Sequence, residues 1–373
     1  MYKAARAALL YARPRPGPGK PENGLPAPTW TISGGSLKRW QFWIGLAVSA
    51  IFLWLALRGL RLDDLWEALR GARYAWLIPG IAAYFVAVWA RAWRWHYLLR
   101  PLKRIPLRTT FPVVAIGYMG NNIYPARAGE VLRAYVLRRR EAVPMPASLA
   151  TIVVERAFDG IVMLGFVFLN LSELAGATAD SGLVGDIRTL AVLGAAGFLL
   201  AVLAFLLMAV FQPQAERIVG WLAQRLLPRR WREQALGLAV RFLSGLASLR
   251  SGRDILLVLG TSVVIWLFET LKYWLVMHAF PFEVSFFALM LMNGIVNLAT
   301  TIPSAPGYLG TFDAPGIAVL VAFGVERASA AGYTLVLHAA LWLPITVLGA
   351  YYMARESLSW RAVREQVSTE AEA

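Results

Sequence analysis

Three ionisable side chains lie inside one long apolar segment of the chain: Glu155, Arg156 and Asp159. In a helix, Glu155 and Asp159 share a face, and Arg156 lies three residues before Asp159. Each charge placed inside a bilayer costs roughly 2.5–3.5 kcal/mol on insertion scales, so such a cluster needs a purpose. Three interpretations stay open: a structural ion pair that fixes this helix to a neighbour, a cluster that handles protons or a polar headgroup, and side chains that extend to the membrane surface. The surface is distant for the short carboxylates of the third interpretation.

Five polar residues border an interruption that follows a short apolar stretch over 111–124: Asn121, Asn122, Arg127, Glu130 and Arg133. The amides at the start of a helix attract anions, and the planar guanidinium of arginine matches phosphate oxygens. Arg127 lies inside the turn. A role as a positively charged anchor at the membrane surface explains an arginine at this position poorly. We therefore predict that Arg127 binds phosphate. The two asparagines either satisfy freed backbone groups or contact a polar headgroup.

A second apolar stretch, over 286–324, is interrupted by Pro303, Pro306 and Gly307. Non-helical backbone at membrane depth is tolerated only where it is buried in protein or lines a wet cavity. The polar residues around this second break are therefore predicted to contact a substrate: Asn297, Tyr308, Thr311 and Asp313. Asp313 has an alternative role as the cap of a half-helix over 314–323.

Three further polar residues have structural or coupling roles in the prediction: Glu269, Lys272 and His338. Glu269 and Lys272 lie three residues apart in one segment and are expected to pair as a buried salt bridge. His338 lies deep in the last segment and is either a hydrogen-bonded packing residue or a proton relay. Arg91 and Arg94 lie near the end of an earlier segment, where we expect their long side chains to reach the membrane surface.

The composition argues against a water-soluble protein. Hydrophobic residues make up 58% of the 373 residues and charged residues only 16%, against about 25% charged in typical soluble domains. Segments near the roughly 20 residues that cross a bilayer are predicted over 41–58, 75–97, 149–171, 189–211, 255–279 and 330–353. The fold prediction is an all-α polytopic membrane protein with about six full spans. Two re-entrant half-helix pairs, at the breaks, bring the number of segments to about eight.

The charge distribution predicts the orientation. Lys and Arg outnumber Asp and Glu, 37 to 22, and they gather in alternate loops. This pattern predicts cytoplasmic amino and carboxyl termini in a prokaryotic cytoplasmic membrane. The Pro-, Gly- and Arg-rich residues 1–37 are predicted to be a disordered cytoplasmic tail, and 356–373 a second cytoplasmic tail. No base-stacking motif accompanies the basic residues, so nucleic-acid binding is not expected.

The two breaks superpose when the sequence is shifted by 178 positions, which places Pro125 on Pro303 and Gly129 on Gly307. The same shift places Arg94 on Lys272. Because the loop charges give the two units opposite orientations, an inverted repeat is predicted, with units at about 75–171 and 253–353. Inverted repeats with paired broken helices are typical of alternating-access transporters.

The sequence carries no familiar catalytic signature. It has no cysteine, and its three histidines are too far apart to suggest a metal site. No Walker loop, nucleophile elbow or paired-histidine motif occurs. We predict no catalytic residue, no cofactor and no metal.

Three ordered motifs resemble the lysylphosphatidylglycerol synthetase transmembrane-region family, also described as flippase-like: Asn122-x-x-Pro125-x-Arg127-x-Gly129-Glu130-x-x-Arg133, Glu155-Arg156-x-x-Asp159 and Pro306-Gly307-x-x-Gly310-x-x-Asp313. The resemblance covers roughly 40–355 and implies a flippase-like transmembrane domain at 38–355. In bifunctional relatives this region moves aminoacylated phospholipid between leaflets, and a separate soluble domain makes that lipid. Few residues follow the last span, so synthetase activity is not expected. The sequence departs from the family pattern at Asp313 and Tyr308.

The expected function is that of a lipid translocase. It would move a phosphate-containing lipid, with or without an aminoacyl or sugar group, through a polar cavity at the midplane. The alternative is a non-transporting membrane partner of a separate lipid-modifying transferase. A third interpretation, an intramembrane enzyme, would use the carboxylates as acid and base. The expected partners are a membrane lipid and, in the alternative, that transferase; the oligomeric state is left open.

Overall fold

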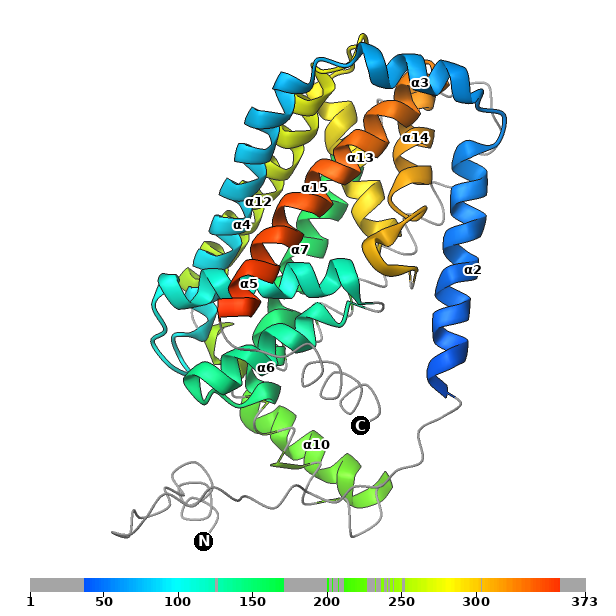
Figure 1. Ribbon diagram of the computed structural model, residues 1–373. Coiled ribbons are helices and arrows are strands. Elements are labelled where there is room, and N and C mark those ends of the chain that lie inside the picture. Colours follow the sequence, from blue (N-terminus) through cyan, green and yellow to red (C-terminus); the bar gives the residue numbers. More distant parts are fainter. Residues whose placement is uncertain are drawn as a thin grey trace, which may run out of the picture. The chain divides into compact units, whose positions relative to one another are not determined.

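Figure 1 shows the computed structural model of the protein. The structure describes residues 37–124, 127–170, 211–226, 245–249, 252–302 and 304–355, together with scattered positions between 200 and 243. The chain forms two compact units, Met1–Arg39 and Trp40–Ala373, and the long apolar helices belong to the second. The predicted tails, most of the predicted segment over 189–211, and Pro125 and Pro303 lie outside the described residues.

Every regular element among the described residues is a helix, as the all-α prediction requires. The α-helices are α2 (Leu37–Leu57), α3 (Leu62–Gly71), α4 (Leu77–Leu99), α5 (Leu107–Ile123), α6 (Gly129–Glu141), α7 (Met145–Leu169), α10 (Gln212–Leu226), α12 (Gly252–Met277), α13 (Phe286–Ala299), α14 (Asp313–Ala322) and α15 (Arg327–Arg355). Short 3₁₀ turns lie at η1 (Tyr74–Trp76), η2 (Leu246–Leu249) and η3 (Pro306–Tyr308).

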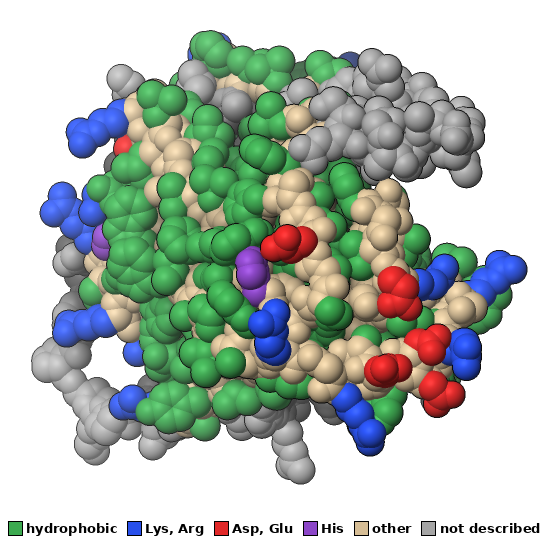
Figure 2. Space-filling view, turned by 90° about the horizontal axis from the view of Figure 1, so that it is seen from above, with side chains coloured by type: hydrophobic (Ala, Val, Ile, Leu, Met, Phe, Trp, Pro, Cys, Tyr) green, Lys and Arg blue, Asp and Glu red, His purple; other side chains and the backbone are tan. Residues whose placement is uncertain are grey.

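Three helices in the described part of the chain are long and apolar enough to cross a membrane: Tyr74–Leu99, Gly252–Met277 and Arg327–Arg355. A fourth is added if Gly45–Leu57 and Leu62–Gly71, which meet at 82°, are counted together. The 25 residues of α7 are also long enough, but this helix carries the three ionisable residues Glu155, Arg156 and Asp159. Large hydrophobic side chains remain on the outside, among them Trp43, Leu256 and Val347, and hydrophobic side chains cover much of the view in Figure 2.

Helices α4 and α12 pack along each other and run in opposite directions (Figure 1). Small residues on α4 allow this close approach: Ala83 and Ala87 are buried, and a Cβ at Gly80 would lie 2.8 Å from Val276 Cγ2. Around this pair, α5 packs against α15 and α6, while α13 packs against α7 and α14. The helices α4–α7 therefore make the same kinds of contact as the helices α12–α15.

Each of these helix series contains a hairpin of two α-helices that are separated by a break, and the second break includes the 3₁₀ turn η3. The first hairpin is α5–α6 and the second is α13–α14, and Figure 1 shows them toward opposite ends of the α4–α12 pair. The two predicted breaks in helix are therefore present. The two breaks approach each other, since Arg127 Nη2 donates to Thr300 O over 3.4 Å. Near the end of α5, Asn122 O accepts a hydrogen bond from Trp342 Nε1 of α15 over 3.4 Å.

The first hairpin is too tight for any residue but glycine at its closest point. A Cβ at Gly129 would lie 1.9 Å from Gly117 O and 2.4 Å from Asn121 N. We expect Gly129→Ala to force α5 and α6 apart and to lower the free energy of unfolding by about 3 kcal/mol or more. Thermal unfolding of the protein in detergent measures this change. Gly165→Ala is the control, because a Cβ there meets nothing within 4 Å, and an unchanged melting temperature for Gly129→Ala would contradict this packing.

Candidate functional site

A cavity of about 140 Å³ lies where the two hairpin turns meet. One water needs about 10–15 Å³ of volume measured in this way, so the cavity has room for on the order of ten waters or a small polar group. Nine of the predicted site residues line it: Asn121, Asn122, Arg127, Arg156, Glu269, Lys272, Asn297, Tyr308 and His338. The other six are not among its lining residues: Glu130, Arg133, Glu155, Asp159, Thr311 and Asp313.

The remaining lining residues were not predicted as site residues from the sequence. It consists of Tyr84, Arg91, Tyr118, Trp266, Thr300, Phe312, Leu341 and Trp342. Most of these are aromatic or aliphatic residues inside apolar helices, where they are indistinguishable from ordinary core residues. Arg91 carried a usable signal, because the 178-residue shift places it on Glu269.

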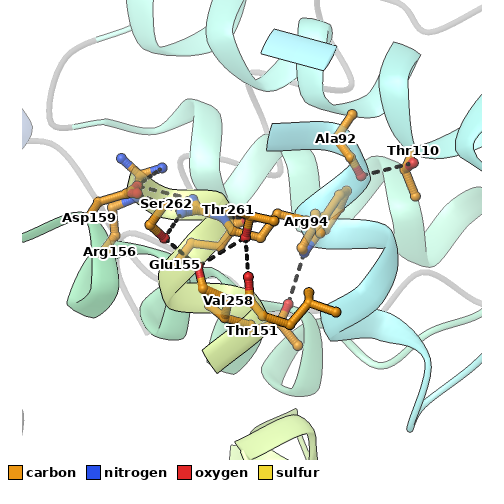
Figure 3. Close-up of polar contacts among 12 residues, drawn as sticks. Ala92, Arg94, Thr110, Thr151, Glu155, Arg156, Asp159, Val258, Thr261 and Ser262 are labelled. Carbon is orange, nitrogen blue, oxygen red and sulfur yellow. Dashed lines mark hydrogen bonds and ion pairs between the residues drawn. The ribbon is translucent and has the colours of Figure 1, made fainter. Parts of the chain in front are cut away.

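An arginine on α4 holds the carboxylates of α7. Arg94, 0% exposed, donates to both carboxylate oxygens of Asp159 over 2.6 and 3.1 Å and to Ser262 Oγ over 2.5 Å (Figure 3). Trp266 Nε1 on α12 also donates to Asp159, over 3.0 Å. Asp159 thereby links α7 to α4 and α12.

Glu155 is held in the same way by a second arginine. Arg133 of α6 donates to Glu155 Oε2, and its guanidinium lies 4.0 Å from the ring centre of Trp95. Arg94 Nε is 3.8 Å from Glu155 Oε1. Both carboxylates of α7 are thus buried and paired, which is the geometry of the structural interpretation.

The expectation that Arg91 and Arg94 reach the membrane surface is wrong. Their exposed fractions are 6% and 0%, because each finds a carboxylate on another helix. Arg94 pairs with Asp159, and Arg91 pairs with Glu269. Such pairing offsets the cost of removing a guanidinium from water, so the side chain has no need to extend outward.

A buried triad forms one wall of the cavity. Glu269 accepts hydrogen bonds from Arg91 and from Lys272, so the predicted pair of Glu269 and Lys272 is confirmed and gains a third member. The Lys272 ammonium also lies 4.5 Å from the ring centre of Tyr84, and the Arg91 guanidinium 5.6 Å from that of Tyr118. These aromatic faces give further stabilisation to the two cations.

Arg127 occupies the first turn in a strained backbone conformation. Its φ is +54°, a left-handed value that L-residues other than glycine rarely adopt. Its guanidinium has no carboxylate partner among the described residues, and its buried Nε has no hydrogen-bond partner there. Arg156 faces the same cavity, 3.5 Å from both Asp159 and Glu130. The turn therefore presents a cation whose hydrogen-bonding capacity is largely unused.

The second turn is held by a histidine and a carboxylate. His338 Nδ1 lies 2.8 Å from Asp313 Oδ1, and Nε2 donates to Gly307 O over 2.7 Å. Asp313 Oδ2 accepts the amide hydrogen of Gly310 over 2.9 Å. Both ring nitrogens of His338 therefore contact oxygen atoms at the second turn. Thr311 ties the same turn together through Ser304 Oγ over 3.1 Å.

A comparison of the sequence with protein families gives a match to the lysylphosphatidylglycerol synthase TM region over residues 42–349. The chain belongs to this family. The match covers α4 to α14 and most of α15, and so includes both hairpin turns and every residue of the cavity. Membership also identifies the apolar helices as those of an integral membrane protein.

Several curated proteins are similar to this family member. The glycosyltransferase AglD of Haloferax volcanii is 28% identical over 73% of this chain, which spans only 47% of that relative. Two UPF0104 membrane proteins of Methanothermobacter thermautotrophicus are each 25% identical, over 76% and 85% of this chain and 86% and 93% of their own lengths. The chain thus spans about half of the glycosyltransferase but nearly all of the two membrane proteins.

Proposed function

We propose that this member of the family moves a phosphate-containing lipid between the two leaflets of the membrane. The observation that carries the proposal is the cavity itself, which is polar, rich in cations and placed where the turns of two hairpins meet. A core that only held helices together would have no use for Arg127, whose guanidinium lacks a carboxylate partner among the described residues. The family, defined by a lipid-modifying synthase, supports a lipid-related role.

An inverted repeat explains how the two turns come together. The helices α4–α7 and α12–α15 correspond in order and in packing, and α4 runs opposite to α12. Arg91 and Glu269, which are 178 residues apart, are equivalent under the shift that superposes the two breaks, and they contact each other directly. Equivalent residues meet in this way when a two-fold axis passes between them. This contact supports repeat units at about 75–171 and 253–353.

In the proposed mechanism, Arg127 and Arg156 hold the phosphate while the acyl chains remain in the lipid. The amides of Asn121, Asn122 and Asn297 supply neutral donors to the headgroup. Glu155 and Asp159 act as positioning residues, because they fix α7 and its Arg156 against the neighbouring helices. The two broken helices allow either unit to move without unwinding a continuous span.

Reconstitution in liposomes tests the proposal. The full chain is inserted into vesicles containing a fluorescent phospholipid, and a membrane-impermeant quencher reports the fraction of probe in the outer leaflet over time. We expect the probe to cross faster than in vesicles without protein or with a heat-denatured sample. Equal crossing rates in all three would overturn the translocase proposal.

The same repeat predicts on which side of the membrane two loops lie. Arg104 and Glu283 are exposed residues that precede α5 and α13, at almost equivalent positions of the two units. Because the chain contains no native cysteine, Arg104→Cys and Glu283→Cys give single labelling sites. We expect an impermeant maleimide to label residue 283 in intact cells, and residue 104 only after the membrane is opened, with both termini cytoplasmic. Labelling of both from outside would contradict the inverted arrangement.

One observation favours a second function, that of a membrane partner for a separate lipid-modifying transferase. The relative named as a glycosyltransferase is about twice as long as the part this chain matches. In that case the chain would bind a transferase and would not transport lipid alone. Co-purification of a transferase with the tagged chain, combined with no lipid crossing in the liposome assay, would favour this role over the first.

A further inference from the structure

The charged lining of the cavity is mostly positive. Among the described residues, four cationic side chains line it: Arg91, Arg127, Arg156 and Lys272. The described lining contains one carboxylate, Glu269, and this group already accepts hydrogen bonds from Arg91 and Lys272. An ammonium group on a ligand would therefore find no free carboxylate in this part of the wall.

The carboxylates behind the wall are also held by protein groups. Three of them pair with arginines: Asp159 with Arg94, Glu155 with Arg133 and Glu130 with Arg156. Asp313 accepts the amide hydrogen of Gly310 and lies 2.8 Å from His338 Nδ1. Even with an uncharged His338, these carboxylates and Glu269 are outnumbered by the Arg and Lys side chains that surround them. Releasing a carboxylate for a ligand would leave a buried cation without its partner, which is costly.

Aromatic faces, the other common partners of an ammonium group, are largely taken by protein cations. The Lys272 ammonium lies 4.5 Å from the ring centre of Tyr84. The Arg91 guanidinium lies 5.6 Å from the ring centre of Tyr118 and 5.5 Å from that of Trp266. A positively charged headgroup would approach these rings beside a charge of its own sign.

Three tyrosine hydroxyls at the cavity are unused. Tyr84, Tyr118 and Tyr308 line it, and their hydroxyls make no hydrogen bond to a described residue. None of the three hydroxyls is enclosed without a partner, so open space lies beside each. The buried Tyr333 differs, because its hydroxyl donates to Tyr273 O over 2.8 Å. A tyrosine hydroxyl both donates and accepts, and so it complements a hydroxyl group on a ligand.

We propose that the cavity selects an anionic phospholipid whose headgroup carries hydroxyl groups and no amino group. This inference rests on the proposed function and names its substrate class: Arg127 takes the phosphate, and the tyrosine hydroxyls take the headgroup hydroxyls. Aminoacylated phospholipids, such as the one in the family's description, are excluded. Their ammonium groups would enter a cavity with excess positive charge and no free carboxylate in its described wall.

Binding of matched lipids to the purified full chain tests the charge requirement. Native mass spectrometry in detergent compares phosphatidylglycerol, lysylphosphatidylglycerol and a lysylphosphatidylglycerol with both amino groups acetylated. We expect phosphatidylglycerol to bind about tenfold or more tightly than the lysyl lipid, because like charges brought together cost several kcal/mol. Acetylation is expected to recover affinity. Equal affinities for the first two lipids would overturn the proposal, and so would an acetylated lipid that binds as weakly as the lysyl lipid, since size would then decide.

Lys272→Met tests the role of the engaged carboxylate. The variant removes one cation and leaves Glu269 paired with Arg91 alone. We expect the preference for phosphatidylglycerol over the lysyl lipid to fall about tenfold. Arg108→Met, which changes an exposed arginine, is the control and is expected to keep the native preference. An unchanged preference in folded Lys272→Met would overturn the proposal. If that variant does not fold, the three lipids on the native chain decide alone.

Phosphatidylethanol, a diester of the same charge without headgroup hydroxyls, tests the hydroxyl requirement. We expect phosphatidylglycerol to bind more tightly than phosphatidylethanol, and Tyr84→Phe to reduce this difference about threefold, the worth of one hydrogen bond. Tyr351→Phe changes a tyrosine that is 53% exposed and is expected to have no effect. Equal binding of the two lipids by the native chain would overturn the requirement.

Two further measurements separate this proposal from its neighbours. Deacylated phosphatidylglycerol, the soluble headgroup, is titrated in its own arm, and an affinity equal to that of the lipid would overturn a lipid ligand. Selective binding of phosphatidylglycerol without lipid crossing in the liposome assay would overturn only the proposed transport. Equal crossing rates for phosphatidylglycerol and the lysyl lipid would overturn only the selectivity.

Discussion

Replacement of Arg94 by methionine is expected to lower the free energy of unfolding by about 3–5 kcal/mol, which is what removing one member of a buried ion pair costs. Arg94 is fully buried and donates to both oxygens of Asp159 and to Ser262. Methionine fills much of the same volume, so the loss reports the weakened pairing of Asp159 and not an empty space. Asp159 then keeps only Arg156 at 3.5 Å and the indole of Trp266. Denaturation in detergent, followed by tryptophan fluorescence, gives the change in stability.

Two further variants make this result specific. Arg108→Met changes an exposed arginine in the first turn of α5 and is expected to stay within about 0.5 kcal/mol of the wild type. The double variant Arg94→Met/Asp159→Leu removes both charges of this pair. It is therefore expected to lose less stability than the sum of the losses in the two single variants. Strict additivity, or an Arg94→Met protein as stable as Arg108→Met, would contradict the pairing of α4 with α7.

The sequence predicted which residues are charged inside the membrane region but not which partners they take. Glu155 and Asp159 stand out from the sequence alone, because carboxylates are rare in apolar helices. Their partners lie 22 and 65 residues away, on α6 and α4, and only the packing of the helices brings them together. For the same reason Arg94 was expected at the membrane surface and is instead in the core.

The cavity was predictable where it depends on the breaks in helix. Asn121, Arg127 and Tyr308 are polar residues beside Pro and Gly, and such a combination in an apolar stretch indicates backbone that lines a cavity. The aromatic part of the wall, which includes Tyr84 and Trp342, was not predictable. An aromatic residue in an apolar helix has the same signature whether it faces lipid, core or cavity.

Replacement of Arg127 by alanine is expected to slow lipid crossing in liposomes by about 10- to 100-fold. A hydrogen bond to a charged group is worth about 1.5–3 kcal/mol, and each 1.36 kcal/mol is a factor of ten in rate. Alanine retains the Cβ, so the strain of a φ of +54° at this position is unchanged. Arg127→Lys keeps the charge but lacks the planar guanidinium that fits phosphate. Its rate of lipid crossing is therefore expected to lie between those of the wild type and Arg127→Ala.

The ordering of these rates separates a phosphate contact from a structural role. Within the described part of the chain, the Arg127 guanidinium makes one long hydrogen bond, 3.4 Å to Thr300 O. Loss of this side chain is therefore expected to leave the melting temperature almost unchanged while lipid crossing slows. Arg108 is an exposed residue of the same hairpin, and in Arg108→Ala the lipid is expected to cross at the wild-type rate. If Arg127→Ala crossed as fast as Arg108→Ala, the lipid phosphate would have to bind elsewhere, since Arg127 is the cavity cation with no carboxylate partner among the described residues.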